Sequence, residues 1–317
     1  MENFYLISLG KTNVLDPNFA HKQSQENNIM TDKILISPHQ LQQMAESLPT
    51  VIIDTRSPEA YAAGHIPGAV NLHDIFTFLA TSTKEGLEEL RGKFVSAFGD
   101  AGLSGEEVAV IYEDSMDTGF GQSCRGYFLL EFLGYPKAAI LHGGYKGWLA
   151  EKLPISDVTS TPEAKTFPVD TSAANVMLTK DDMLESLNKP EIIKLDVRDV
   201  DEWVATSSSP YGIDFCPRKG RIPGAVWLEW YRMMKPGEEV PVFKSKEELQ
   251  AESATVGIGP DSTVYVYCFK GARASNTYIA LKEAGVKDVR IYFGSWNEWS
   301  RDPELPIEEG HQIWAAA

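Results

Sequence analysis

The chain has 317 residues, which is too long for one ordinary hydrophobic core and favours two domains. Its formal net charge is −16, and a surface this acidic disfavours binding to nucleic acid or to anionic membranes, because both need a basic patch. Its 43% hydrophobic and 23% charged residues are ordinary for a globular protein, and no stretch approaches the ~20 apolar residues of a membrane span.

Three cysteines, Cys124, Cys216 and Cys268, are too few and too scattered for a disulfide framework. Free thiols persist in reducing compartments, so we expect a cytoplasmic protein. No Cys-x-x-Cys motif or Cys/His cluster suggests a metal site, and no Gly-x-Gly-x-x-Gly or Walker motif suggests a nucleotide. The sequence therefore predicts neither a metal ion nor a cofactor.

The first 30 residues are polar and show no hydrophobic periodicity. They lack the charged and apolar regions of a secretory signal. We expect a disordered tail over 1–30, or an extension ahead of an alternative start at Met30. The first folded domain is predicted at 31–155.

Two apolar runs in the first half are typical of buried strands. The run at 51–53 leads into Asp54 and Arg56, and an Ile-Pro-Gly-Ala turn follows at 66–69. The run at 108–112 is followed by a long polar loop and then a helical stretch. His65 lies just before the turn, and histidine is a common acid or base in enzymes, but we expect His65 to tie the turn to Asp54 instead.

Residues 156–175 are rich in Ser, Thr, Ala and Pro, and this composition predicts a linker. The second domain is predicted at 176–312, and it repeats the pattern of the first. Asp196 and Arg198 follow its first strand, and the Ile-Pro-Gly-Ala turn recurs at 222–225. We expect Asp196 to anchor this half as Asp54 anchors the other.

Strands that alternate with helical stretches predict the α/β class, with two tandem domains that are each a mainly parallel sheet flanked by helices. Ligands of such sheets bind at the carboxyl ends of the strands. This rule singles out the loops that follow Tyr112 and Tyr267.

Cys268 opens the loop that joins a strand of the second half to its next helix. Gly271 allows this loop to curl so that backbone N–H groups point inward, and the helix adds the positive end of its dipole. Lys270 and Arg273 place positive charge nearby. These features favour a reactive thiolate and would stabilise a persulfide anion formed on it, whereas an inert buried cysteine is the plainer alternative.

Residues 61–72 (YAAGHIPGAVNL) and 293–299 (FGSWNEW) resemble the N- and C-terminal signatures of the rhodanese family in its tandem-domain form. The loop from Cys268 to Arg273 resembles the six-residue active-site loop of that family. The resemblance implies two rhodanese-like domains over residues 34–310. It also implies an enzyme that moves a sulfane sulfur from a small anionic donor to a thiophilic acceptor, such as cyanide or a thiol.

The same resemblance assigns roles to single residues. Cys268 matches the nucleophile that forms the persulfide, and Arg198 matches an arginine that clamps the anionic end of the donor. Lys270 matches a loop lysine of thiosulfate-using members, and Arg273 is expected to organise the loop from below. The remaining residues expected at the substrate site are Phe269, Gly271 and Ala272.

The first half departs from the family pattern at the corresponding position. Glu113 stands where Cys268 stands in the second half, and the loop that follows it is longer. A carboxylate in a longer loop does not suit an anion. We therefore expect the first domain to be catalytically inactive and to form one wall of an interdomain cleft.

Several functions share the same thiolate. Thiosulfate is the favoured donor because Lys270 and Arg273 suit a doubly charged anion, but Arg198 suits the carboxylate of 3-mercaptopyruvate equally well. A carrier that passes persulfide to a protein partner is a further alternative. A phosphatase is disfavoured, because only four residues separate Cys268 from Arg273, one fewer than in a Cys-x5-Arg loop.

The other two cysteines are expected to be inert. Cys124 lies in a helical stretch, where packing in the core is the simplest role. Cys216 lies in an insertion at 207–219 that delays the second Ile-Pro-Gly-Ala turn. A role for Cys216 as a resolving thiol is the alternative.

Overall fold

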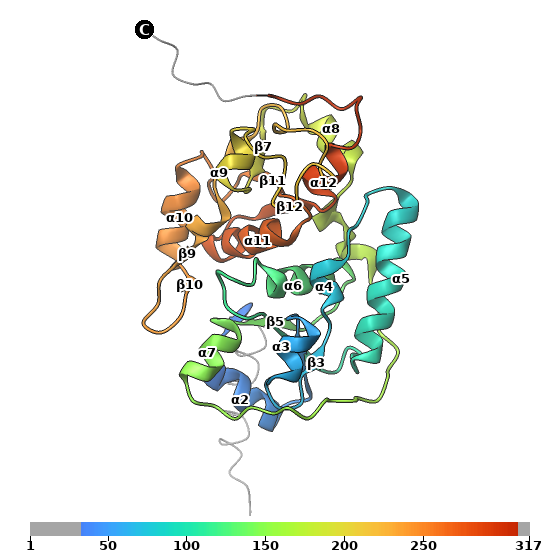
Figure 1. The fold of residues 1–317 in the computed structure, drawn as a ribbon, viewed down its shortest axis with the longest axis vertical. Helices are drawn as coiled ribbons and strands as arrows, with labels where there is room; N and C mark the ends of the chain where they lie inside the picture. Colours follow the sequence, from blue (N-terminus) through green and yellow to red (C-terminus); the bar gives the residue numbers. More distant parts are fainter. Residues whose placement is uncertain (1–32, 310–317) are drawn as a thin grey trace, which may run out of the picture.

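The structure, a computed structural model, describes residues 33–309. The tail predicted over 1–30 and residues 310–312 of the predicted second domain lie outside this range. The described chain forms two α/β domains stacked along its long axis, the first at the bottom of Figure 1 and the second at the top.

The first domain is built on a five-stranded parallel sheet with the order β1-β5-β4-β2-β3. Its strands are β1 (Leu35–Ile36), β2 (Thr50–Asp54), β3 (Val70–Asn71), β4 (Val108–Tyr112) and β5 (Ala138–Leu141). Its helices are α2 (Pro38–Ser47), α3 (Pro58–Ala62), α4 (Asp74–Thr77), α5 (Lys84–Asp100), α6 (Gln122–Phe132) and α7 (Gly144–Ala150). Every residue of β4 is buried, as expected for a central parallel strand that helices cover on both faces.

The second domain repeats this sheet with the order β6-β12-β11-β7-β8, again all parallel. Its strands are β6 (Met177–Leu178), β7 (Ile192–Asp196), β8 (Val226–Trp227), β11 (Thr263–Tyr267) and β12 (Asp288–Tyr292). Its helices are α8 (Lys180–Ser186), α9 (Val200–Trp203), α10 (Lys246–Ala254), α11 (Ala272–Ala284) and α12 (Ser295–Trp299). The predicted fold class, two tandem domains with mainly parallel sheets, is confirmed.

The second domain also contains a small antiparallel hairpin that the sequence patterns did not predict. Its strands are β9 (Met234–Lys235) and β10 (Val242–Phe243), and a short 3-10 helix, η2 (Trp230–Met233), precedes it. The backbone N–H of Phe243 donates a hydrogen bond to Nε2 of His142 in the first domain, 2.8 Å away. The hairpin therefore ties the second domain to the first.

The two domains meet through α6 and α11, which lie next to each other at mid-height in Figure 1. The ring of Phe128 on α6 packs against Tyr278 of α11 and Phe293, with centroid distances of 5.2 Å and 5.6 Å. Lys282 and Glu131 form an ion pair of 2.6 Å across the same interface. One apolar cluster continues from the first domain into the second, so their relative placement is fixed by core packing.

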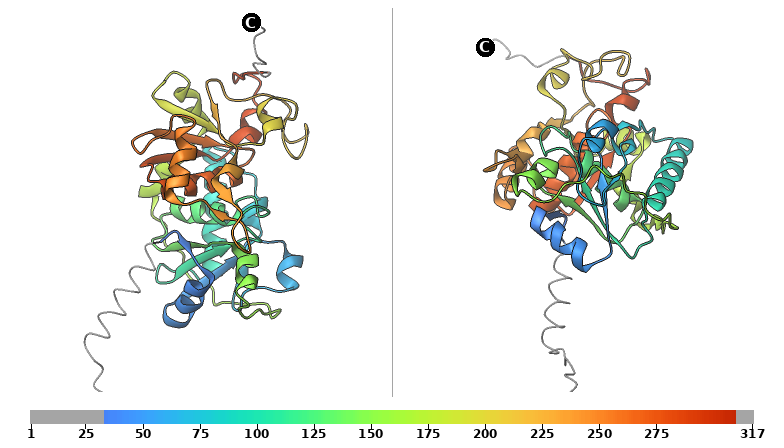
Figure 2. Two further views of the ribbon diagram at one scale, coloured as in Figure 1. Left: turned by 90° about the vertical axis from the view of Figure 1, so that its left-hand side faces the viewer. Right: turned by 60° about the horizontal axis from the view of Figure 1, so that its bottom comes forward.

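The segment between the domains runs along the surface of the first domain, as the light-green loop at the bottom and right of Figure 1 shows. Ser156 pairs with His65, and the N–H of Lys165 donates to the carbonyl of Gly99 at 2.9 Å. The chain then enters the second domain through a 3-10 helix, η1 (Thr171–Val176). The left view of Figure 2 shows from the side that the second domain is stacked directly on the first. Within residues 33–309, every helix is too short or too polar to cross a membrane.

Candidate active site

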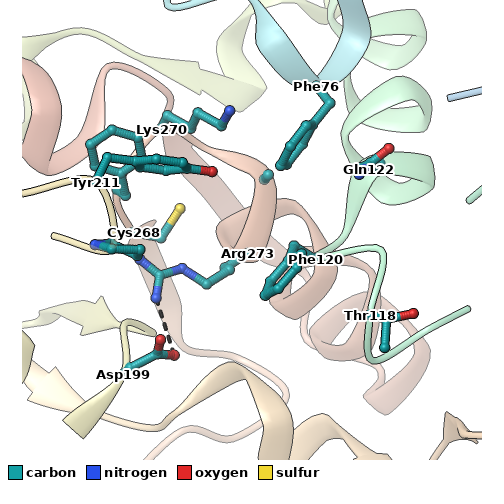
Figure 3. Close-up of a pocket in the computed structure, with 12 residues that line it drawn as sticks. Phe76, Thr118, Phe120, Gln122, Asp199, Tyr211, Cys268, Lys270 and Arg273 are labelled. Atoms are coloured by element: carbon teal, nitrogen blue, oxygen red, sulfur yellow. Dashed lines mark ion pairs between the residues drawn. The ribbon is translucent and has the colours of Figure 1, made fainter. Parts of the chain in front are cut away.

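A cavity of about 390 Å³ lies between the domains at the carboxyl end of β11, and Cys268 opens into it. Figure 3 shows the sulfur atom pointing toward side chains that come from both domains. The first domain supplies four of the lining residues, and the second supplies eight. They are Phe76, Thr118, Phe120 and Gln122 from the first domain, and Asp199, Pro210, Tyr211, Cys268, Phe269, Lys270, Ala272 and Arg273 from the second.

The loop after β11 curls around the sulfur atom. The backbone N–H of Gly271 points at Sγ of Cys268, 3.1 Å away, and α11 begins at the next residue. Gly271 has a φ of 90°, and a Cβ atom there would lie 2.9 Å from Cδ2 of Phe293. Only glycine fits this position without strain, and its amide and the helix dipole both favour negative charge on the sulfur.

A second loop holds the active-site loop from behind. The N–H of Cys268 donates to Oγ of Ser295 at 3.2 Å, and Ser295 itself has a φ of 53°. The N–H groups of Trp296 and Asn297 donate to the carbonyls of Cys268 and Phe269, each at 3.0 Å. The FGSWNEW segment therefore has a role that its sequence alone did not reveal, because it fixes the backbone that carries Cys268.

Arg273 lies below the loop, where two carboxylates balance the positive charge of its guanidinium group. Its Nη1 atom is 2.6 Å from Oε2 of Glu202 and 3.1 Å from Oδ1 of Asp199. Arg273 and Glu202 are both buried. This ion pair anchors the start of α11 against α9, and it leaves Arg273 little net charge to offer an anion in the cavity.

Lys270 lines the cavity between two aromatic rings. Its Nζ atom lies 3.8 Å from the ring centre of Phe76 and 5.4 Å from that of Tyr211. Desolvation, assisted by the nearby charge of Arg125, lowers the pKa of Lys270 to about 8. At neutral pH the ammonium group remains charged next to Cys268, held by two aromatic faces.

Arg125 of α6 brings a second cation toward the sulfur, and the sequence analysis did not identify it. Its Nη1 and Nη2 atoms donate to the carbonyls of Phe76 and Phe78 at 3.0 Å and 2.7 Å. The side chain is fully buried, and burial lowers its pKa to about 10, while the negative charge on Cys268 favours its charged form. An arginine of the first domain thus adds to the positive potential around Cys268.

Arg198 departs from the expectation that it clamps the donor. Its side chain is fully buried, its Nη2 atom lies 2.6 Å from Oδ2 of Asp196 and 2.8 Å from the carbonyl of Gly220, and it is not part of the cavity wall. Arg56 and Asp54 make the same pair in the first domain at 2.6 Å. The duplicated Asp-x-Arg motif is thus a folding element, and its presence in both halves was the signal available in the sequence.

His65 also has different partners from those expected. Its Nδ1 and Nε2 atoms lie 2.9 Å and 3.1 Å from the carbonyls of Tyr61 and Val158. Asp54 instead accepts hydrogen bonds from Arg56 and from the hydroxyl of Tyr112, at 2.5 Å for the latter. His65 therefore ties the turn to the linker rather than to Asp54.

The first domain has Glu113 at the place that corresponds to Cys268. Oε2 of Glu113 accepts hydrogen bonds from the N–H groups of Gln122 and Ser123 at the start of α6, at 2.6 Å and 3.4 Å. Burial raises the pKa of this carboxyl group to about 8. The amides that would otherwise receive an anion are thus already occupied by the protein's own side chain.

The insertion at 207–219 forms a wall of the cavity that the sequence analysis did not assign. Tyr211 packs on Phe269 with a ring-centre distance of 4.9 Å, and Phe215 contacts the same ring at 6.4 Å. Cys216 lies beneath, fully buried, and burial raises its pKa. Burial also raises the pKa of Cys124, so both thiols are poorly suited to nucleophilic chemistry.

Comparison with known proteins extends these observations. Residues 37–151 and 179–302 each match the family model described as a rhodanese-like domain. Over 277 residues the chain is 31% identical to a thiosulfate sulfurtransferase from Azotobacter vinelandii, which covers 87% of this chain and 97% of that protein. It is 28% identical over 259 residues to the sulfur carrier protein TtuD of Thermus thermophilus, with 80% and 88% covered.

Solved structures share the same architecture. Wild-type EanB superposes with a TM-score of 0.75 at 24% identity, covering 88% of this chain and 69% of that chain. The anaerobic ergothioneine biosynthesis enzyme from Chlorobium limicola, solved with trimethyl histidine, gives a TM-score of 0.74 at 24% identity, with 88% and 70% covered. At this level of identity the likeness supports the fold alone.

Proposed function

The chain belongs to the rhodanese family, with two rhodanese-like domains in tandem, and we propose that it transfers a sulfane sulfur from thiosulfate to a thiophilic acceptor through a persulfide on Cys268. One observation carries the proposal. The sulfur of Cys268 opens into a cavity while it faces the N–H of Gly271 and the start of α11, with Lys270 beside it. This environment favours a thiolate and then a persulfide anion.

The reaction proceeds in two displacement steps. In the first, the thiolate of Cys268 attacks the outer sulfur of thiosulfate. The sulfur–sulfur bond of the donor breaks, sulfite leaves with the electron pair, and Cys268 becomes a persulfide. In the second, the acceptor attacks the terminal sulfur, the bond to Sγ breaks, and the thiolate of Cys268 is restored. Cyanide then leaves as thiocyanate, and a thiol leaves as its persulfide.

The surrounding residues divide the remaining work. Lys270 and the N–H of Gly271 stabilise the negative charge on the donor and on the persulfide. Arg273 holds the loop through its ion pair with Glu202, and Phe269 and Ala272 complete the wall around the sulfur. Arg198 has no place in this scheme because its side chain is buried outside the cavity wall, with Nε and Nη2 bound to Asp196.

Two variants of this function use the same intermediate. 3-Mercaptopyruvate as donor would place its carboxylate near Lys270, which lines the cavity. A persulfide carrier would pass the sulfur to a protein thiol, as the name of the Thermus thermophilus relative suggests for that protein. Within the described residues the cysteines are free and buried, so we place this chemistry in a reducing compartment, the cytoplasm.

The test is sulfur transfer from thiosulfate to cyanide, followed as thiocyanate, for the wild type, Cys268→Ser and Cys216→Ser. We expect steady turnover that is lost in Cys268→Ser and kept in Cys216→Ser. Stoichiometric persulfide without turnover would favour the carrier, and turnover from 3-mercaptopyruvate alone would reassign the donor. Thiocyanate production by Cys268→Ser would overturn the proposal.

A further inference from the structure

The cavity above Cys268 is larger than the proposed donor requires. Its volume of about 390 Å³ falls in the range of sites that bind organic ligands, about 300–1,000 Å³. Thiosulfate and cyanide each contain only a few heavy atoms. In a two-step displacement the donor and the acceptor occupy the same cavity in turn. The volume that thiosulfate leaves unfilled is therefore available to the body of the acceptor.

The wall of this extra volume is largely aromatic. Phe76 and Phe120 come from the first domain and Tyr211 and Phe269 from the second, and Figure 3 shows the labelled rings around the sulfur atom. Phe120 is 45% exposed and Tyr211 is 47% exposed. Large rings that stay open to solvent around a nucleophile indicate a surface that a ligand covers.

Neighbouring side chains hold these two rings in place. Phe120 packs against Trp230 with a ring-centre distance of 5.9 Å, and its φ of 57° is unusual for a residue other than glycine. Tyr211 packs against Phe269 at 4.9 Å. The aromatic surface is therefore built before any ligand arrives, which lowers the entropy cost of binding.

Charge in the cavity is concentrated beside the sulfur. Lys270 lies against Phe76, whereas Arg273 is compensated by Asp199 and Glu202. A ligand that fits this pattern has an anionic end near Lys270 and an uncharged, apolar body that lies along the rings. A thiolate attached to an aromatic group has this form.

We infer that the sulfur acceptor is a small organic thiol with an aromatic body, which lies between Phe76, Phe120 and Tyr211 while its thiolate reaches the persulfide of Cys268. This inference rests on the proposed function, since it names the acceptor of the second step. The acceptor thiolate attacks the terminal sulfur, the bond between that sulfur and Sγ breaks, and the pair of electrons returns to Cys268. The product is the persulfide of the acceptor, and the step needs no oxidant or reductant.

The experiment compares acceptors on an enzyme that already carries the persulfide. Cys268 is loaded with thiosulfate, and discharge is measured in a single turnover with 2-phenylethanethiol, 1-propanethiol and glutathione. The first two thiols share the same CH2–SH end, so they differ chiefly in the body that the cavity would hold. We expect the second-order rate constant for 2-phenylethanethiol to exceed that for 1-propanethiol by about tenfold or more.

The preference for 2-phenylethanethiol should disappear when an aromatic residue of the cavity wall is replaced by alanine. In Phe120→Ala and in Tyr211→Ala we expect the ratio of the two rate constants to approach one. Leu149→Ala is the matched control, because Leu149 is a 43% exposed apolar residue on α7 outside the cavity, and it should keep the wild-type ratio. A ratio measured within each variant is insensitive to differences in the fraction of loaded enzyme.

Three outcomes would overturn the inference. They are equal rate constants for the two alkyl thiols in the wild type, a preference for glutathione over both, or a preference that survives in both alanine variants. A preference for an aromatic compound only during loading, seen with benzenethiosulfonate against thiosulfate, would assign the cavity to the donor instead. If thiosulfate fails to load Cys268, the proposed function fails at its first step. The acceptor test then proceeds with enzyme loaded by inorganic polysulfide.

Discussion

Arg56 and Arg198 make equivalent contacts in the two domains, because each guanidinium binds the aspartate two residues before it and one carbonyl of the turn that follows. The carbonyls are those of Gly64 and Gly220, at 2.7 Å and 2.8 Å. The tyrosines that end the neighbouring strands, Tyr112 and Tyr267, donate to the same aspartates. The first domain has Glu113 where the second has Cys268. Contacts that both domains share therefore do not depend on the thiol, and we assign them to the stability of the fold.

Replacing either arginine by lysine should therefore destabilise the protein without weakening the binding of thiosulfate. Lysine keeps the charge but loses the paired hydrogen bonds, so we expect Arg56→Lys and Arg198→Lys each to lower the free energy of unfolding by about 2 kcal/mol. Urea denaturation measures this change, and the KM for thiosulfate should stay within about twofold of the wild type. A tenfold rise in KM for Arg198→Lys alone would return Arg198 to the donor site.

Gly271→Ala should lower the rate of sulfur transfer while the protein stays folded. The new Cβ atom would lie 2.9 Å from the ring of Phe293 at a φ of 90°, so the N–H that faces Sγ must move. We expect a loss of about tenfold or more in kcat/KM for thiosulfate. Gly257→Ala is the control, since Gly257 has a φ of 79° but open space around it. Equal losses in both variants would contradict the assigned role of the Gly271 amide.

Lys270 should give persulfide formation a pH dependence centred near its pKa of about 8. The ammonium group is charged below this pH and neutral above it, so its attraction for thiosulfate is present below about pH 8 and lost as pH rises further. We expect the ratio of the rate constants for sulfite release, wild type over Lys270→Met, to be about tenfold or more at pH 6–7 and to approach one above pH 9.

Lys270→Arg provides the control for this profile, because its guanidinium stays charged throughout the range. For this variant the same ratio against Lys270→Met should not fall as pH rises. The rate constants are measured during loading of the persulfide in a single turnover. No acceptor is present in this step, so the ionisation of an acceptor does not affect them. A ratio near one at every pH for the wild type would remove Lys270 from the donor site.

Glu113 should make stability depend on pH. Its pKa is about 8 in the folded protein, above the ordinary value of 4.5, so the carboxyl group favours the fold below about pH 4.5 and loses this contribution as pH rises toward 8. Glu113→Gln keeps an oxygen that accepts the N–H groups of Gln122 and Ser123 but does not ionise. We expect this variant to gain stability over the wild type by up to about 1.4 kcal/mol per pH unit between these limits. Urea titrations at pH 5, 6, 7 and 8 measure the gain, and a difference that does not change with pH would contradict it.

The architecture was predictable from the sequence because it depends on local, repeated patterns. The apolar runs at 51–53 and 108–112, their counterparts near Asp196 and Tyr267, and the duplicated turn sufficed to predict the two parallel sheets. The β9–β10 hairpin was not predicted, because strands of two residues leave no period to detect.

The loop around Cys268 could also be predicted from the sequence, because Lys270, Gly271 and Arg273 lie within six residues of the thiol. The rest of the cavity could not be predicted, because Phe76 and Phe120 lie in the other half of the chain, far in sequence from Cys268. Nothing local in the sequence distinguishes an aromatic residue at a cavity wall from one in the core. Arg125 was missed for the same reason, because only tertiary packing brings α6 against the loop.

The apolar cluster shared by α6 and α11 has a consequence for the history of the duplicated chain. The first domain, which has Glu113 where the second has Cys268, supplies Phe76, Phe120 and Arg125 to the surroundings of Cys268, and it covers a helix that is buried along almost its entire length. The two halves therefore form one inherited unit, and the loss of the first would remove part of the cavity wall around Cys268.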